Sequence, residues 1–373
     1  MRITRIHCLA VRIPLRPERR MISSLGQHVV SDYPLIRVET DAGIDGVGEA
    51  TVSPLWSGET VWGAQAIIER VFAPLLVGAD PTDIADIDRR MDSAAEGNWF
   101  AKSAIEMACW DIVGKDTGKP VYALLDGLVR PREITCRFSM GAYPPERVRN
   151  TVPDLIARGF HTIKVKVGQS IEKDVERVAL VRELIGPDRA IVIDANCGYS
   201  PEDAIESARR MEPYHVGLFE QPTPRDDYEG LALVRKNVSM PVMADDMVFT
   251  FNQARECLRH DAVDVISIYP GKCGGIRKCR RIAEMAAEQG VACSIGSNLE
   301  LDVGTAAMCH LVVGTPNMQV ERVPGDILGP AYHEVSIAKN PLQIAGPVVT
   351  TPDGPGLGVE IDWGVAEKLA IGS

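Results

Sequence analysis

The sequence predicts an α/β fold in which a parallel (β/α) barrel is joined to a smaller α+β capping domain. From about residue 132, short apolar segments alternate with amphipathic ones, and the apolar segments end about every 25 residues, which is the repeat of a strand–helix unit. Before that point, strand and turn signals are followed by helical periodicity. A doubly wound sheet would need a glycine-rich phosphate loop, and Val167-Gly168-Gln169 does not supply one.

Composition narrows the class of protein. The 373 residues are 45% hydrophobic and 24% charged, as in an ordinary globular protein with a large core. The 40 Lys and Arg against 51 Asp and Glu give a net charge of −11, which argues against a nucleic-acid partner. No apolar run approaches the ~18 residues of a membrane span, and the start lacks the apolar core of a signal peptide. The nine dispersed cysteines form no Cys-x-x-Cys pair, so we expect reduced thiols in a cytoplasmic protein with no membrane partner.

We expect the chain to divide into three segments. Residues 1–125 form the N-terminal part of the capping domain, with strands and then helices at 2–11, 33–40, 46–49, 59–72, 82–94 and 100–116. Residues 126–335 form the barrel, and residues 336–373 return to the capping domain through Gly-Pro turns. The barrel strands are expected at 134–140, 162–167, 190–194, 217–220, 242–245, 265–269, 292–295 and 318–321, with helices between them, for example at 171–185, 201–211 and 276–289.

Three consecutive barrel strands end in a carboxylate. Asp194, Glu220 and Asp245 occupy these positions, and the C-terminal ends of barrel strands are where active sites lie. Converging acids repel one another unless a cation sits among them. An all-oxygen set suits Mg²⁺ first and Mn²⁺ second. A single strand-end acid is often only solvated or a helix cap, but three in consecutive strands favour a metal site.

Two lysines share one face of an earlier strand. Lys164 and Lys166 are two residues apart, so both side chains point to the barrel interior together with Thr162. Their shared positive field disfavours protonation and favours the neutral amine that a general base needs. Two exposed edge lysines are the alternative. With the acids, the lysines indicate a metal that holds a substrate carboxylate, a lysine that removes the α-proton, and a stabilised enediolate.

Several motifs, in this order and spacing, resemble those of the enolase superfamily, in particular its mandelate racemase/muconate lactonizing enzyme branch. They are the hairpin 43–50, the helix 104–112, Asp194-Ala195-Asn196, Glu220-Gln221-Pro222, Gly274-Gly275-Ile276 and the tail segment 355–359. The resemblance covers nearly the whole chain and implies a modified, enolase-like TIM barrel. It implies Asp194, Glu220 and Asp245 as Mg²⁺ ligands, Lys166 as the catalytic base and Lys164 as its electrostatic neighbour.

The sequence departs from the family pattern at the end of the sixth strand. Tyr269 stands where the family usually carries a second catalytic lysine, and a phenol with an ordinary pKa near 10 weakens a two-base mechanism, although it still protonates or hydrogen-bonds a leaving hydroxyl. Asp246 stands where the branch usually has Glu. We expect Lys272 to face a loop rather than reach back to the site, and Glu300 to orient a neighbour rather than bind metal.

Substrate specificity is expected to come from capping-domain loops at 19–28 and 53–59. There, Arg20 and His28 would meet a second carboxylate or hydroxyls and Trp56 would wall an apolar group, whereas a solvated loop is the alternative. Further expected contacts come from the barrel: Asn196, Asp246, Lys272, Ser297 and Glu300.

The expected activity is Mg²⁺-dependent abstraction of the proton α to the carboxylate of a small substrate. A single standard lysine favours chemistry on one face, so cycloisomerisation of the lactonizing type comes first. Dehydration of an acid sugar or hydroxy acid by syn β-elimination comes second, and racemisation or epimerisation third. A non-enzymatic alternative is a degenerate relative that binds metal and ligand without turnover. The resemblance also implies a homo-oligomer, from dimer to octamer.

Overall fold

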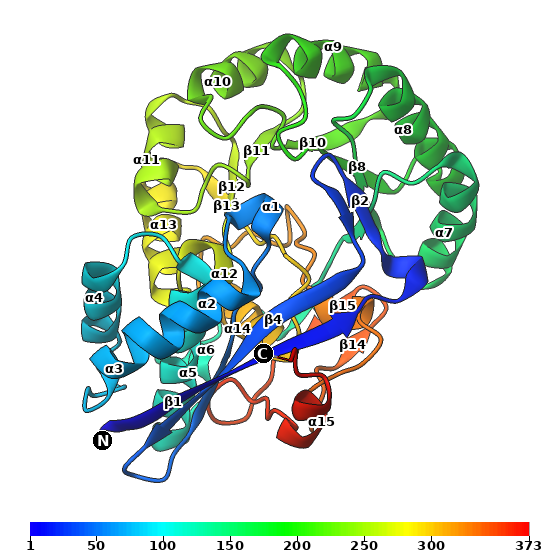
Figure 1. The fold of residues 1–373 in the computed structure, drawn as a ribbon. Coiled ribbons are helices and arrows are strands. Elements are labelled where there is room, and N and C mark those ends of the chain that lie inside the picture. The colour runs from blue at the N-terminus through cyan, green and yellow to red at the C-terminus, as the bar shows by residue number, and fades with distance from the viewer. Residues whose placement is uncertain (373) are drawn as a thin grey trace.

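A curved parallel sheet forms the centre of the molecule. The computed structural model describes residues 1–372, and in Figure 1 helices lie along an arc outside the strands. Seven strands pair in chain order, β7 to β13, each with its neighbour in parallel. Their bounds are Phe138–Met140, Thr162–Lys166, Ala190–Asp194, Val216–Glu220, Val242–Ala244, Val265–Ser267 and Ala292–Ser294. The predicted fold class, a (β/α) barrel with a capping domain, is confirmed.

The last predicted barrel strand does not form. Within residues 1–372, segment 318–321 makes only an isolated bridge between Met318 and Cys293. Pro316 and Pro324 flank the segment and lack the N–H that would extend a ladder. The curved sheet therefore has seven strands in place of eight, and the chain that follows the bridge is a loop.

The helices outside the barrel form where apolar periodicity predicts them. They are α7 Pro145–Ala157, α8 Ile171–Ile185, α9 Pro201–Met211, α10 Tyr228–Asn237, α11 Phe251–Arg259, α12 Pro270–Cys273, α13 Ile276–Glu288 and α14 Asp302–Val313. Two of them, α8 and α9, have the predicted bounds. Ser200 caps α9 by accepting from Asp203 N, and Thr250 with Gln253 forms a capping box on α11.

The capping domain begins with an antiparallel sheet in the order β1-β4-β5, formed by Ile3–Pro14, Val30–Thr40 and Gly46–Glu49. A hairpin of β2 Met21–Ser23 and β3 Gly26–His28 leaves this sheet. The helices are α1 Pro54–Ser57, α2 Val61–Ile67 with a π-helical turn to Phe72, α3 Ala73–Leu76, α4 Ile84–Ala94, α5 Trp99–Thr117 and α6 Val121–Leu124. Strand β5 packs so closely on α5 that a Cβ at Gly48 would lie 1.8 Å from Ala104 O, so only glycine fits there.

Buried carboxylates in the motif segments fasten the capping domain to the barrel. Glu49 accepts hydrogen bonds from Leu301 N and Gly304 N at the start of α14. Glu106 on α5 accepts from the first two backbone N–H groups of α13. Each carboxylate meets the positive end of a helix dipole, so these motif residues have a structural role.

The C-terminal tail divides between the two domains. Strands β14 Ile344–Ala345 and β15 Val348–Thr350 pair with β6 Glu133–Thr135, so only the second half of the predicted strand 134–140 joins the barrel. The last part, with α15 Trp363–Lys368, reaches β1, where Ala370 bridges Val11. In Figure 1 the red C-terminal segment lies beside the blue N-terminal strands. Within residues 1–372, no helix has the length and apolar character needed to cross a membrane.

Candidate active site

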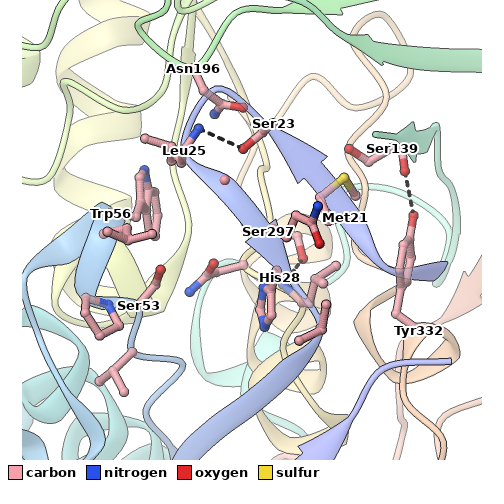
Figure 2. Close-up of a pocket in the computed structure, with 18 of the residues that line it drawn as sticks. Met21, Ser23, Leu25, His28, Ser53, Trp56, Ser139, Asn196, Ser297 and Tyr332 are labelled. Atoms are coloured by element: carbon pink, nitrogen blue, oxygen red, sulfur yellow. Dashed lines mark hydrogen bonds between the residues drawn. The ribbon is translucent and has the colours of Figure 1, made fainter. Parts of the chain in front are cut away.

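A cavity of about 400 Å³ lies between the capping domain and the C-terminal ends of the barrel strands, within the usual range for ligand pockets. Figure 2 shows Leu25 of the hairpin between Trp56 and Asn196, with Met21 and His28 farther along the hairpin. Eight of the predicted site residues line it: His28, Trp56, Lys164, Lys166, Asn196, Asp245, Tyr269 and Ser297.

Lys166 is at the barrel end of this cavity. Its Nζ donates to Asp194 Oδ2 at 2.5 Å and to Asn196 Oδ1 at 2.6 Å. Lys166 and Asp194 are paired in the ladder between β8 and β9, which explains why the side chains meet. Burial alone would raise the pKa of Asp194, but the charges of Lys166 and Lys164 outweigh it and lower that pKa. The carboxylate therefore stays ionised and orients the amine.

Lys164 lies behind this pair among three carboxylates. Its Nζ is 2.9 Å from Asp326 Oδ2, 3.0 Å from Glu220 Oε1 and 3.2 Å from Asp194 Oδ2. Burial lowers the pKa of Lys164, but the charges of Asp326 and Glu220 outweigh it and raise the pKa. The prediction that neighbouring lysines would favour a neutral amine is wrong for Lys164, because carboxylates outnumber the cations around it.

Two charged residues of this cluster were not found from the sequence. Arg137, fully buried, donates through Nη2 to Glu220 Oε2 at 2.7 Å. Asp326 lines the cavity and follows the segment that fails to form the last strand. One feature of the sequence could have indicated Arg137: it is a charged residue within the mostly apolar strand segment from Cys136 to Met140. Asp326 lies five residues beyond the predicted strand end, so reading strand ends alone could not find it.

Lys272 points into the barrel and not toward a loop as predicted. Its Nζ donates to Asp245 Oδ1 at 2.7 Å and to the carbonyl oxygens of Asp245 and Ser267, both at 2.8 Å. The short helix α12 turns the side chain back beneath β11 and β12, where it is fully buried. Lys272 therefore fixes Asp245 and does not line the cavity.

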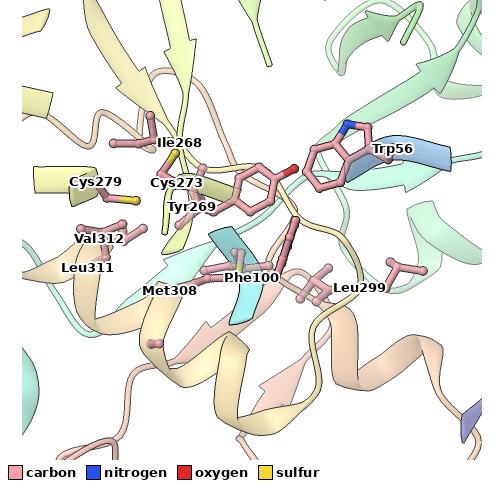
Figure 3. Packing of buried hydrophobic residues seen from close by; sticks show 14 of the residues in the cluster. Trp56, Phe100, Ile268, Tyr269, Cys273, Cys279, Leu299, Met308, Leu311 and Val312 are labelled. Atoms are coloured by element: carbon pink, nitrogen blue, oxygen red, sulfur yellow. The ribbon is translucent and has the colours of Figure 1, made fainter. Parts of the chain in front are cut away.

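Trp56 of the capping domain packs against the barrel residue Tyr269. Figure 3 shows the two rings side by side, with Phe100 nearby. Trp56 Nε1 donates to Asp246 Oδ1, and Asn196 Nδ2 donates to Asp246 Oδ2 at 3.2 Å. Burial raises the pKa of Tyr269 well above its ordinary value, so the phenol stays protonated and its O–H is available as a donor.

The remaining predicted contacts fall in different places. His28 lines the cavity with its Nε2 3.1 Å from Ser31 Oγ. Ser297 also lines it and donates to Glu300 Oε2 at 2.7 Å, so Glu300 shapes the loop from behind. Arg20, predicted to contact substrate, precedes the hairpin, is exposed, and is not brought to the cavity lining.

The predicted metal ligands stand at neighbouring strand ends. Glu220 is paired with Asp194 in the ladder between β9 and β10, and with Met243, two residues before Asp245, on the other side. In the described part of the chain, no three His, Cys, Asp or Glu side chains lie close enough together to hold a metal ion. Lys164 donates to a carboxylate oxygen of Glu220, and Lys272 donates to one of Asp245. Burial raises the pKa of Glu220 to about 8. The negative charges of Asp194 and Asp245 also raise it, whereas the positive charge of Arg137 lowers it. The donors of Asp194, Glu220 and Asp245 are all oxygens, which is the kind of ligand that a hard divalent cation prefers, although the three carboxyl groups do not converge on one point in this structure.

The barrel has buried acids and lysines at its strand ends and is covered by a capping domain. Two known protein families match these two parts of the chain. The family "Enolase C-terminal domain-like" matches residues 147–365. The family "Mandelate racemase / muconate lactonizing enzyme, N-terminal domain" matches residues 4–126. The chain belongs to the enolase superfamily, in its mandelate racemase/muconate lactonizing enzyme branch, and is an enzyme of that superfamily.

Similar proteins catalyse different reactions. An N-succinyl-L-Arg/Lys racemase of Bacillus cereus is 30% identical over 100% of this chain and 98% of its own. Muconate cycloisomerase 1 of Rhodococcus opacus is 32% identical over 96% of both chains. The structure of a dipeptide epimerase from Enterococcus faecalis, complexed with Mg and the dipeptide L-Leu-L-Tyr, superposes with a TM-score of 0.91 at 30% identity, covering 96% of this chain and 100% of that one.

Proposed function

We propose that this enzyme removes the proton α to the carboxylate of a small substrate with Lys166 as its base, and that it works on one face of the enediolate. The observation that carries the proposal is the pair of residues at the ends of β8 and β12. Lys166 on β8 reaches the cavity, whereas the β12 side presents the phenol of Tyr269. Strands β9, β10 and β11 separate β8 from β12 in the curved sheet, so these residues approach a substrate from different sides.

Each residue of the cluster has a role in this proposal. Asp194 and Asn196 hold the amine of Lys166 at the cavity. Lys164 adds a fixed positive charge near the substrate carboxylate, which it attracts. A Mg²⁺ ion held by Asp194, Glu220 and Asp245 would stabilise the negative charge of the enediolate. Mn²⁺ is the second choice for the same oxygen ligands.

Cycloisomerisation of the lactonizing type fits this one-base arrangement best. The α-carbon gains or loses its proton through Lys166, while the carbon–oxygen bond of the ring forms or breaks without a second base. Syn dehydration is the second candidate, because the buried, protonated phenol of Tyr269 lines the cavity and is suited to hydrogen-bond a departing hydroxyl. Racemisation comes third, since it requires a proton carrier on each face. A relative that binds ligand without turnover is the non-enzymatic alternative.

Exchange of the substrate α-hydrogen with solvent deuterium tests the base. In Mg²⁺-loaded protein supplied with a panel of lactone acids, hydroxy acids and N-acyl amino acids, the substitution Lys166→Ala should lower exchange by about 10²–10⁴-fold. Lys173→Ala is the matched control, because Lys173 is exposed on α8. Exchange that survives at the original rate in Lys166→Ala rejects Lys166 as the base, and absence of exchange from the whole panel favours a binding protein.

A further inference from the structure

The side of the cavity formed by the capping domain is apolar and lacks a free cation. Among the described lining residues, the only Lys or Arg side chains are Lys164 and Lys166, both on β8 at the barrel end. The hairpin and the segment around α1 contribute mostly apolar side chains: Met21, Leu25, Val29, Val30, Val52, Pro54, Leu55, Trp56, Val61 and Trp62. The cavity therefore has a charged end and an apolar end.

The polar groups at the apolar end do not offer charge to a ligand. Asp32 is held by Arg12, which donates from Nε at 2.7 Å and from Nη2 at 2.6 Å. His28 is beside the hydroxyl of Ser31, and burial lowers its pKa, so the ring is neutral at pH 7. A second carboxylate of a substrate would lose its hydration here without gaining a cationic partner, which is unfavourable.

The mouth of the cavity exposes large apolar side chains. Leu55 is 73% exposed, Trp62 60% and Val29 39%, and all three line the cavity. Scattered exposed apolar residues need no explanation, but several around one opening mark a binding surface. They continue the apolar wall that Leu25 and Trp56 form inside the cavity.

We propose that the substrate carries a single carboxylate, bound at the β8 end, and an uncharged aryl or branched alkyl group that extends between the hairpin and Trp56 to the rim formed by Val29, Leu55 and Trp62. The occupant of this apolar surface is the substrate and not a second protein, because the surface is continuous with the cavity that holds Lys166. The position of the reacting carbon rests on the proposed function. If the enzyme is a cycloisomerase, the ligand that meets this description is the lactone. One of its carboxylates is free, and the other is part of the neutral ring.

Calorimetric titration of the Mg²⁺-loaded protein with unreactive acids tests the proposal without requiring turnover. The probes are 4-phenylbutanoate, butanoate and the dianion adipate. We expect 4-phenylbutanoate to bind about tenfold or more tightly than butanoate, because burial of a phenyl ring contributes at least that factor. Adipate should bind no more tightly than butanoate. Adipate that binds as tightly as 4-phenylbutanoate would overturn the proposal.

The substitution Leu55→Arg places a cation on the rim. It should weaken the binding of 4-phenylbutanoate and strengthen the binding of adipate, each by about threefold or more. Leu128→Arg should change neither affinity. Leu128 is the matched control because it is 50% exposed and lies outside the cavity lining. Unchanged affinities in Leu55→Arg, together with a smaller oligomer in sedimentation, would show that the rim is an interface between copies and overturn the proposal.

The deuterium exchange panel separates this inference from the proposed function. Exchange confined to short or dianionic acids rejects the apolar substrate but leaves Lys166 as the base. Tight binding of 4-phenylbutanoate in a protein that exchanges none of the acids rejects the proposed chemistry and retains the apolar subsite.

Discussion

The indole of Trp56 lies parallel to the phenol ring of Tyr269, with the ring centroids 5.7 Å apart and the planes 8° apart. One residue belongs to the capping domain and the other to the end of the barrel core, so the stack joins the two domains across the cavity. The indole N–H also holds Asp246, the neighbour of the proposed metal ligand Asp245. The capping domain therefore sets the position of barrel residues in the site as well as covering it.

The substitution Trp56→Phe keeps a ring against Tyr269 but removes the N–H. Asp246 Oδ1 would then keep only the 3.5 Å contact from Asn196 Nδ2. Because an unsatisfied buried acceptor costs about 1–3 kcal/mol, we expect the free energy of unfolding to fall by about that amount in denaturant titrations. The control is Trp62→Phe, at an exposed rim position. Equal stability of the two variants would mean that the bond to Asp246 contributes nothing.

Substitutions of Tyr269 test whether chemistry is confined to one face. Tyr269→Lys places an amine at the end of β12, across the sheet from Lys166, and should introduce solvent deuterium into both enantiomers of a chiral substrate. Tyr269→Phe removes the hydroxyl and should retain exchange at the Lys166 face. Polarimetry and mass spectrometry of recovered substrate measure both effects. If the unmodified enzyme already racemises its substrate, the phenol or another group serves the second face and the one-base proposal fails.

The sequence was sufficient to predict the residues whose places depend on strand ends. Lys166 and Asp194 meet because apolar runs of the right length place both at the ends of adjacent strands, and ladder pairing then brings them together. The positions of Lys272 and Asp326 could not be predicted in this way, because they depend on the turns and loops that follow the strands. The single helical turn of α12 reverses Lys272 toward Asp245, and Asp326 follows a loop whose path depends on contacts with distant strands. Neither effect is encoded in the periodicity of the local sequence.

Addition of Mg²⁺ should stabilise the fold. Binding to the folded state alone raises the free energy of unfolding by about 2.7 kcal/mol at a metal concentration 100 times Kd, and it relieves the repulsion that contributes to the raised pKa of Glu220. We therefore expect a higher Tm with Mg²⁺ than with equal ionic strength of Na⁺. The increase should be lost in Asp245→Asn and retained in Asp226→Asn, where the side chain is exposed. An increase of the same size in both variants would remove Asp245 from the proposed ligand set.

Acid should destabilise the protein through a buried histidine. His310 on α14 is fully buried, with Nδ1 3.3 Å from Tyr122 N and Nε2 3.2 Å from Leu357 O. These partners require a neutral ring, with Nδ1 as acceptor and Nε2 as donor. Burial lowers the pKa of His310 from 6.5 to about 4, against the smaller effect of the bond to Leu357. The unfolded chain thus takes up a proton at pH values where the folded chain does not.

The sign of the pH effect follows from that difference. The stability contributed by neutral His310 is fully present above pH 6.5 and is lost as the pH falls from 6.5 to about 4, by up to about 1.4 kcal/mol per pH unit. His310→Gln should reduce the slope of the unfolding free energy against pH in this window by up to the contribution of one proton, which is about 1.4 kcal/mol per pH unit. The two proteins differ only at residue 310. Equal slopes in His310→Gln and the unmodified protein would therefore show that His310 is already protonated in the folded chain. The ring would then accommodate a charge between α14 and the tail.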